Sequence, residues 1–460
     1  MTTNTSFDIT QPLPQGTVLL AASAGTGKTW TISAVCAKAI ATGLVHMENL
    51  LLVTFNRSAA RELRGRVYER LVNTRLLLAG AREPSDPCDW SLIRCGQAGL
   101  TRVESALDNF DRAVITTTHE FASRMLVELG VLSDHDPSSV LMTDLAPLAT
   151  EVSDDHYLAQ YLDCDRPPSV RDKRELSRDV AVKYGEVPIF SKDDADTPVQ
   201  DVLWALSVRE DVRRRSRSRS VHTFDDLIGD LVKALRDPYR GPLACATLAH
   251  RFGLVMVDEF QDTDPLQWEI LRRAFHGHSN LWLIGDPKQS IYAFRGADIH
   301  AYQDAAQSAS HVLHLDVNYR TDKPIVEAVN TLFSNAQLGH DISMELVTAH
   351  HQESRIKTAA TDGPRYHWSQ PFQIRCLQAP AGAQLNTATS DQFVTEDLVN
   401  QVIMMLEGGT VVQDGDGLRP LRPTDIAILV RTRRRGAELA TALSQAHQPA
   451  VFSGCLLYTS

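Results

Sequence analysis

The chain has 460 residues, 43% of them hydrophobic and 22% charged, a composition typical of a globular protein with roughly two to four domains. Its net charge of −11 argues against a simple DNA-coating protein, but local patches steer polyanions, so a nucleic-acid enzyme is not excluded. The sequence predicts a cytoplasmic protein. It has no apolar run of membrane-spanning length, no signal peptide at its start, and seven scattered cysteines without a CxxC pair.

The first motif is a phosphate-binding loop. An apolar run over 17–21 predicts a buried strand, and apolar residues at helical spacing follow from Ile32. Between them lie Ala22, Ser23, Ala24, Gly25, Thr26, Gly27, Lys28 and Thr29. This order is typical of a triphosphate site, where backbone N–H groups and a helix N-terminus attract phosphates. Lys28 would reach the β- and γ-phosphates of ATP, and the Thr29 hydroxyl would bind Mg²⁺. Ala22 stands where the motif usually has glycine, and the alternative is a plain strand–helix turn.

Two further segments carry candidate ligand contacts. Gln15 precedes the first strand, and its amide either reads the edge of an adenine or simply faces solvent. A second strand over 50–55 ends in Thr54 and Phe55, close to several arginines. Phe55 could stack on a base and Thr54 could contact a phosphate of a single strand. The local sequence alone, however, favours a core position for Phe55.

The third strand and the region after it are less informative. The strand over 113–116 leads into Thr118 and His119, which by themselves favour a structural role. Residues 129–222 are rich in acidic clusters and prolines and predict a polar, mainly helical insertion. It ends in five arginines within 213–219, which form either a solvated face or a phosphate-contacting stretch.

Two adjacent carboxylates follow the fourth predicted strand, 254–257. Asp258 would organise Mg²⁺, and Glu259 would take a proton from the water that attacks ATP. The alternative is an acidic loop before the helix that begins at Pro265, but the phosphate loop upstream favours the catalytic interpretation.

The loop after the fifth strand, 281–284, combines two kinds of side chain. Gln289 is placed to sense the γ-phosphate, and Tyr292 and Phe294 are suited to stack on bases. Such a loop would couple hydrolysis to DNA movement.

A second α/β region begins after the strand at 312–315. Arg320 is a candidate clamp for the γ-phosphate, and Tyr319 could stack on adenine. Further along, the pattern predicts helices over 394–406 and 436–445 and strands over 374–377, 426–430 and 450–452. The histidines between 336 and 370 lack regular metal-ligand spacing and indicate a loop-rich connection.

These motifs together resemble a known enzyme family. AASAGTGKT, LLVTFNRSAARELRGR, THEFASRML, DEFQDTDPLQ, GDPKQSIYAFRGAD and NYR follow one another as in superfamily 1 helicases of the UvrD/Rep class. GDPKQSIYAFRGADI, DEFQDTDPLQ, the Phe7-Asp8 lead-in and residues 423–431 are similar in more detail to the RecB family of helicase–nuclease (exodeoxyribonuclease V) subunits. The resemblance covers nearly the whole chain and is weakest between Asp134 and Ser220.

The resemblance implies a fold and a set of residue roles. The fold class is α/β: a P-loop NTPase (RecA-like) parallel sheet with helices on both faces, a mainly helical insertion, and the start of a second RecA-like lobe. The first lobe spans 1–128 and 223–317, the insertion 129–222, and the incomplete second lobe 318–460. The ATP roles fall on Lys28, Thr29, Asp258, Glu259, Gln289 and Arg320, the adenine contacts on Gln15 and Tyr319, and the single-strand track on Phe55, Thr118, His119, Tyr292 and Phe294.

The implied activity is ATP-driven 3′→5′ unwinding of duplex DNA ends in recombinational repair. ATP and Mg²⁺ would be the cofactors, single-stranded DNA and duplex ends the substrates, and RecC-like and RecD-like subunits the partners. An AddA-type enzyme, a stand-alone UvrD-like helicase and a non-helicase ATP-dependent switch remain alternatives.

Two departures from the family concern the end of the chain. A Thr-x-His-x-x-Lys-Gly stretch, a terminal arginine motif and a nuclease domain are missing, and residues 455–460 do not continue the family pattern. We therefore expect an N-terminal fragment that binds nucleotide, hydrolyses it very slowly, unwinds nothing and tends to aggregate through an open sheet edge.

Overall fold

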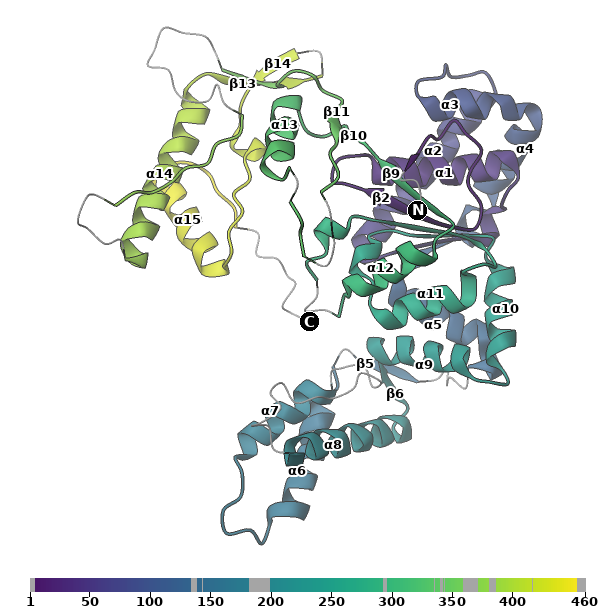
Figure 1. Cartoon of the computed structure of the whole chain (residues 1–460), viewed down its shortest axis with the longest axis vertical. Coiled ribbons are helices and arrows are strands. Elements are labelled where there is room, and N and C mark those ends of the chain that lie inside the picture. The colour runs from purple at the N-terminus through teal and green to yellow at the C-terminus, as the bar shows by residue number, and fades with distance from the viewer. Residues whose placement is uncertain are drawn as a thin grey trace. The chain divides into compact units, whose positions relative to one another are not determined.

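The computed structural model describes residues 5–133, 139–142, 144–181, 199–292, 296–334, 336–339, 342, 344–358, 371–379, 386–415 and 417–452. They form two compact units (Figure 1). The first unit is Met1–Asp316 with Leu338–Ile342, and the second is Val317–Gln337 with Ser343–Ser460. Each unit is considered by itself below.

A parallel sheet of seven strands organises the first unit, in the order β1-β9-β2-β8-β7-β3-β4. The strands are β1 (Thr5–Ser6), β2 (Thr17–Ala22), β3 (Leu50–Thr54), β4 (Val114–Thr117), β7 (Leu254–Val257), β8 (Asn280–Gly285) and β9 (His311–Leu315). The central strands are continuous apolar runs because helices cover both faces of the sheet. The predicted α/β fold class is therefore confirmed, and so are the strands expected in this unit.

Alternate residues of each strand enter two separate cores. Leu20 and Leu52 pack with the face that carries α1 (Lys28–Thr42), α2 (Arg57–Leu78), α3 (Pro87–Leu92) and α4 (Gly96–Asp108). Leu19 and Leu51 point the other way, as the two-residue period of a strand requires. They pack with α5 (Thr118–Leu129), α9 (Phe224–Arg236), α10 (Gly241–Arg251), α11 (Pro265–Phe275) and α12 (Ile299–Ser308).

The insertion has its own small core. Its helices are α6 (Ala146–Tyr161), α7 (Val170–Ala181) and α8 (Val199–Ser218), and it joins the sheet-bearing part through the parallel pair β5 (Val140–Met142) and β6 (Val221–Thr223). Trp204 lies at the centre of this core: its indole N–H donates to the Ser177 hydroxyl at 3.0 Å, and the Lys173 ammonium lies 4.9 Å from its ring. The mainly helical character expected for this region is thus present in its described residues.

The arginine run of the insertion is only partly solvated. Arg215 forms ion pairs with Glu151 at 2.9 Å and Asp155 at 2.7 Å, and Arg219 also reaches Glu151 at 2.7 Å. Arg214 pairs with Asp211 one turn earlier on the same helix. Much of the run therefore ties α8 to α6.

The second unit contains short strands and four helical pieces in its described part. They are β10 (Val317–Asn318), α13 (Lys323–Leu332), β11 (Thr348–Ala349), β12 (Ile356–Thr358), α14 (Thr387–Glu407), β13 (Thr410–Asp414), β14 (Gly417–Pro420), the short 3₁₀ turn Pro423–Asp425 and α15 (Arg433–Gln445). The two predicted helices are confirmed within α14 and α15. The predicted strands over 374–377, 426–430 and 450–452 are wrong, since these residues form no ladder with any described neighbour. Leu429 is 96% exposed, as an unpaired extended segment would be.

None of the helices in the described ranges combines the length and the apolar character that crossing a bilayer requires.

Trp204→Ala should unfold the insertion without unfolding the sheet-bearing part, because the two have separate cores. Loss of a buried tryptophan costs about 3–5 kcal/mol, which a core of this size does not tolerate. Hydrogen exchange should then accelerate in α6–α8 and stay slow in β2 and β8. Trp90→Ala is the matched control, because Trp90 is 63% exposed. Equal acceleration throughout the unit would show that the insertion has no independent stability.

Candidate nucleotide and nucleic-acid site

The chain brings five loops to one edge of the sheet. Because all seven strands are parallel, their carboxyl ends lie side by side, which is where ligands bind in open α/β sheets. The phosphate loop follows β2, the paired carboxylates follow β7, and the Gln289 loop follows β8. Phe55 follows β3, and Thr118 follows β4 at the start of α5.

The phosphate loop has the backbone that its glycines predict. Gly25 and Gly27 have φ of 82° and 89°, values in the left-handed region that residues with a side chain avoid. The Thr26 hydroxyl donates to the Ser23 carbonyl at 2.7 Å and closes the turn before α1. Ala22 is the last residue of β2 and its methyl group is buried in the core, which explains why alanine is tolerated there.

Lys28 and Glu259 form an ion pair across the site. The Lys28 ammonium donates to both carboxylate oxygens of Glu259, at 2.9 and 2.8 Å. Glu259 has a φ of 52°, a left-handed conformation that turns the chain sharply at the end of β7. Strain of this kind in a non-glycine residue is concentrated at functional sites.

Asp258 lies in an unfavourable electrostatic environment. Burial, and after it the negative charge of Glu259, raise the pKa of the Asp258 carboxyl to about 6, although Lys28 acts in the opposite direction. A nearby divalent cation would relieve this excess of negative charge. Asp258 and the Thr29 hydroxyl are oxygen donors of the kind Mg²⁺ prefers, and a nucleotide-bound Mg²⁺ needs only one or two protein ligands. The residues therefore fit the ion, although the described residues contain no cluster of three or more metal-ligating side chains.

The loop after β8 is connected to Glu259 by a residue that the sequence analysis missed. The Gln261 amide donates to Glu259 at 2.7 Å and accepts from the backbone N–H of Asp286 at 2.9 Å. Asp286 in turn accepts from the Gln289 amide at 2.6 Å and from Lys288 at 2.9 Å. The only signal for Gln261 in the sequence is its place in the Asp-Glu-Phe-Gln run.

Two aromatic rings stack at the same edge of the sheet. The Phe55 and Tyr292 rings lie 5.2 Å apart with an interplanar angle of 26°, so the loops after β3 and β8 meet. Phe55 is partly exposed, whereas Thr54 is buried, which favours Phe55 as the contact of the two. Phe294 lies outside the described residues.

Thr118 and His119 are the first two residues of α5. They follow β4, which pairs with β3, the strand that precedes Phe55. Both are partly exposed. The His119 ring lies 3.8 Å from the Asp225 carboxylate and packs edge-on against Phe224 at 5.9 Å.

Gln15 lies away from the phosphate loop. Gln15 lies just before β2, whereas the phosphate loop lies just after β2. The six residues of this strand, about 20 Å long, therefore separate Gln15 from the phosphate loop. The structure does not bring Gln15 together with Lys28.

Tyr319 and Arg320 belong to the second unit. The Asn318 side chain accepts from the backbone N–H groups of Arg320 at 2.9 Å and Thr321 at 2.8 Å, and Arg355 donates to the Arg320 carbonyl. The Tyr319 ring lies 4.8 Å from the His350 ring. The loop that carries both candidate residues is thus held in one conformation within its own unit.

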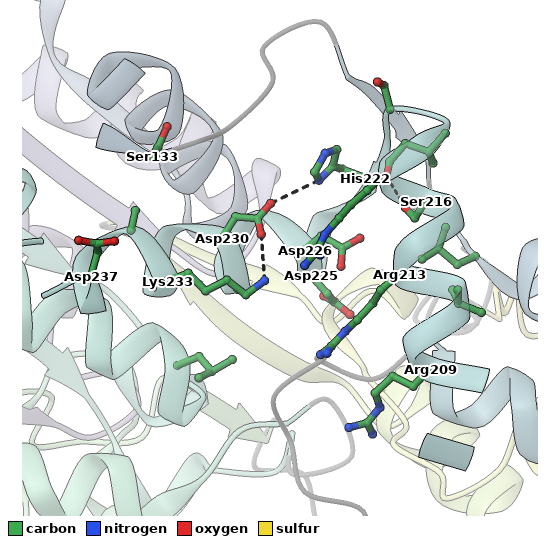
Figure 2. Close-up of a pocket in the computed structure, with 18 of the residues that line it drawn as sticks. Ser133, Arg209, Arg213, Ser216, His222, Asp225, Asp226, Asp230, Lys233 and Asp237 are labelled. Atoms are coloured by element: carbon green, nitrogen blue, oxygen red, sulfur yellow. Dashed lines mark hydrogen bonds and ion pairs between the residues drawn. The ribbon is translucent and has the colours of Figure 1, made fainter. Parts of the chain in front are cut away.

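A cavity of about 430 Å³ lies between α8 and α9 (Figure 2). Arg209 and Arg213 line it from α8, and Asp225, Asp226 and Asp230 from α9. His222 and Lys233 approach the Asp230 carboxylate at 3.4 and 3.2 Å. The mixed charge gives the cavity no preference for an anion.

Comparison with known proteins shows the relatives of this chain. The profile of a family described as UvrD/REP helicase N-terminal domain matches residues 3–310. RecBCD enzyme subunit RecB of Mycobacterium tuberculosis is 35% identical over 97% of the chain, and that of Mycolicibacterium smegmatis is 36% identical over 97%. RecB of Escherichia coli K12 is 34% identical over 53% of the chain. The chain spans 41% of the length of either mycobacterial relative.

Asp258→Asn should stabilise the nucleotide-free fold at pH 8. The carboxyl pKa is about 6 when folded and near 4 when unfolded, so the folded state loses stability as the pH rises from about 4 to 6. The variant should gain on the order of 2 kcal/mol at pH 8, and the gain should vanish near pH 3, below both pKa values, where both states bind the proton. Urea unfolding at both pH values measures it, with the exposed Asp108→Asn as control. A less stable variant at pH 8 would contradict the electrostatic interpretation.

Proposed function

Because this chain belongs to the UvrD/Rep helicase family, we propose that it forms the ATP-driven motor of a RecBCD-type DNA helicase, acting 3′→5′ on duplex ends in recombinational repair. The observation that carries the proposal is the ion pair between Lys28 and Glu259, 2.8 Å apart, on the same sheet edge as the stacked Phe55 and Tyr292. The ion pair joins Lys28, the candidate phosphate ligand, to Glu259, the candidate base that activates water. The stacked rings offer a candidate surface for DNA bases.

The proposed chemistry begins with the exchange of partners by Lys28. When ATP enters the loop, its β- and γ-phosphates compete with Glu259 for the Lys28 ammonium. Released from that pair, the Glu259 carboxylate can accept a proton from the attacking water. Thr29 and Asp258 would hold Mg²⁺, which neutralises phosphate charge when bound. Gln289, in the loop that follows β8, would sense the γ-phosphate.

We propose roles in ATP binding for two residues of the second unit. Arg320 would place a guanidinium on the γ-phosphate, and Tyr319 would stack on the adenine. The hydrogen bonds that Asn318 accepts from the loop support this role, because they fix the backbone from which Arg320 extends. Gln15 remains a candidate adenine contact, although its place before β2 supports it less than Tyr319.

We propose that single-stranded DNA crosses the sheet edge over Phe55 and Tyr292, and Phe294, which lies outside the described residues, remains a candidate stacking residue from the sequence. Thr118 and His119 would contact the DNA backbone from the end of the neighbouring strand. Thr54 remains a candidate from the sequence, although its burial supports it less. Stacking on aromatic rings is tolerant of sequence, which suits a motor that must move along any DNA.

The partners follow from the named relatives. Those relatives are subunits of the RecBCD enzyme, so RecC-like and RecD-like proteins are the proposed partners of this chain, in the cytoplasm where ATP and DNA meet. Co-purification with a RecC-like protein would separate this assignment from a stand-alone UvrD-like helicase. DNA-stimulated ATP hydrolysis would separate both from an ATP-dependent switch that only binds a protein.

In a full-length context, Glu259→Gln should keep ATP binding and lower the hydrolysis rate about 10²–10⁴-fold, because it removes the general base and leaves the phosphate loop intact. Single-turnover hydrolysis with excess protein measures the rate, and displacement of a fluorescent nucleotide measures the affinity. Glu120→Gln on the exposed start of α5 is the control. Hydrolysis at the rate of the unmodified protein would contradict the assignment of Glu259 as the general base.

Phe55→Ala should weaken single-strand binding by about 1–3 kcal/mol with little dependence on base sequence, since it removes one stacking surface. Fluorescence anisotropy with oligothymidylate and oligoadenylate measures this loss. Tyr239→Ala is the matched control, because Tyr239 is 91% exposed. If Phe55→Ala instead lowers the melting temperature and leaves DNA affinity intact, Phe55 is a core residue.

A further inference from the structure

We infer that Gln261 is a positioning residue that couples DNA on the Phe55–Tyr292 pair to the orientation of the Glu259 carboxylate. This inference rests on the proposed function. It concerns the connection between the Lys28–Glu259 ion pair and the Phe55–Tyr292 ring pair.

The Gln261 side chain is inaccessible to both ligands. The residue is 2% exposed, so it touches neither nucleotide nor DNA and acts only through its neighbours. Its amide nitrogen donates to Glu259 at 2.7 Å, to the oxygen that Lys28 contacts at 2.8 Å. Once Lys28 turns to the phosphates of ATP, Gln261 is the remaining described donor to that oxygen.

The other end of the amide holds the loop after β8. The Gln261 carbonyl oxygen accepts from the backbone N–H of Asp286 at 2.9 Å, and the Ser290 hydroxyl donates to the Gln261 backbone carbonyl at 3.2 Å. Two contacts thus fix the start and the middle of a short loop that continues to Tyr292. A movement of Tyr292 on base stacking would reach Gln261 through this loop.

Only a planar group with a donor at one end and an acceptor at the other performs this task. Glutamate at position 261 would turn a carboxylate oxygen toward Glu259, and leucine would remove both hydrogen bonds. Gly285 leaves the necessary space: a Cβ there would lie 2.6 Å from the Gln261 carbonyl oxygen. The glycine therefore permits the close approach, and its own backbone does not require a positive φ.

The coupling predicts a specific defect, to be measured with the sequence carried in a protein of the full length of the named relatives. Gln261→Leu should keep ADP affinity and oligothymidylate affinity, because neither ligand touches residue 261. The rate of single-turnover ATP hydrolysis in the presence of the oligonucleotide should fall about 10²-fold, the cost typical of a misplaced catalytic group. The ratio of the rates with and without DNA should fall toward unity.

Two further variants make the test specific. Gly285→Ala should reproduce the defect by displacing the Gln261 amide, and combining it with Gln261→Leu should add no further loss. Gln261→Leu in a Glu259→Gln background should also have little effect, since the link acts through Glu259. Gln267→Leu is the matched control, because among the described residues Gln267 makes no hydrogen bond with Glu259 or Asp286.

The outcomes separate the two levels of the proposal. Absence of DNA-stimulated ATP hydrolysis by the unmodified sequence, carried in a protein of the full length of the named relatives, would overturn the proposed function and the coupling with it. Unmodified DNA stimulation in a folded Gln261→Leu variant would overturn the coupling alone. An equal loss of the rates with and without DNA, additive with Glu259→Gln, would assign Gln261 a purely structural role and also overturn it. Melting curves without ligand establish that each variant is folded.

Discussion

The site depends on one constraint, which is that parallel strands must all end on the same side of their sheet. The order β2-β8-β7-β3-β4 places the phosphate loop, the carboxylates and the Phe55 loop in sequence along that edge. No single loop contains a whole site. The distance between the candidate ATP-binding groups and the candidate base-stacking rings is therefore set by the spacing of about 4.8 Å between neighbouring strands.

The same edge concentrates charge that the fold cannot neutralise by itself. Asp258 and Glu259 follow β7 directly, and Lys28 is the ammonium group that contacts one of them. Under the proposed function, a phosphate that takes Lys28 would leave the Glu259 carboxylate available. The raised pKa of the Asp258 carboxyl indicates that its ionised form lowers the stability of the folded state.

The sequence predicted the first unit well because buried parallel strands are apolar throughout and the loops between them carry distinctive residues. Such loops predict Lys28, Asp258 and Glu259 as candidate site residues, and the structure brings Lys28 and Glu259 into contact. Gln261 could not be predicted in this way, because its hydrogen bond reaches the backbone N–H of Asp286, which is 25 residues distant in the chain. The strands expected at 374–377 and 426–430 were wrong because an apolar run becomes a strand only where a neighbour supplies its hydrogen bonds.

The insertion, finally, is attached in a way that bears on how this family varies. It leaves and rejoins the chain through β5 and β6, whose three residues pair side by side, while its own core closes around Trp204. Entry and exit points that lie together allow segments between them to lengthen or shorten without moving the flanking helices α5 and α9. Related chains could thus acquire longer or shorter insertions, with new contacts at their tips, while the sheet edge that carries the candidate site stays unchanged.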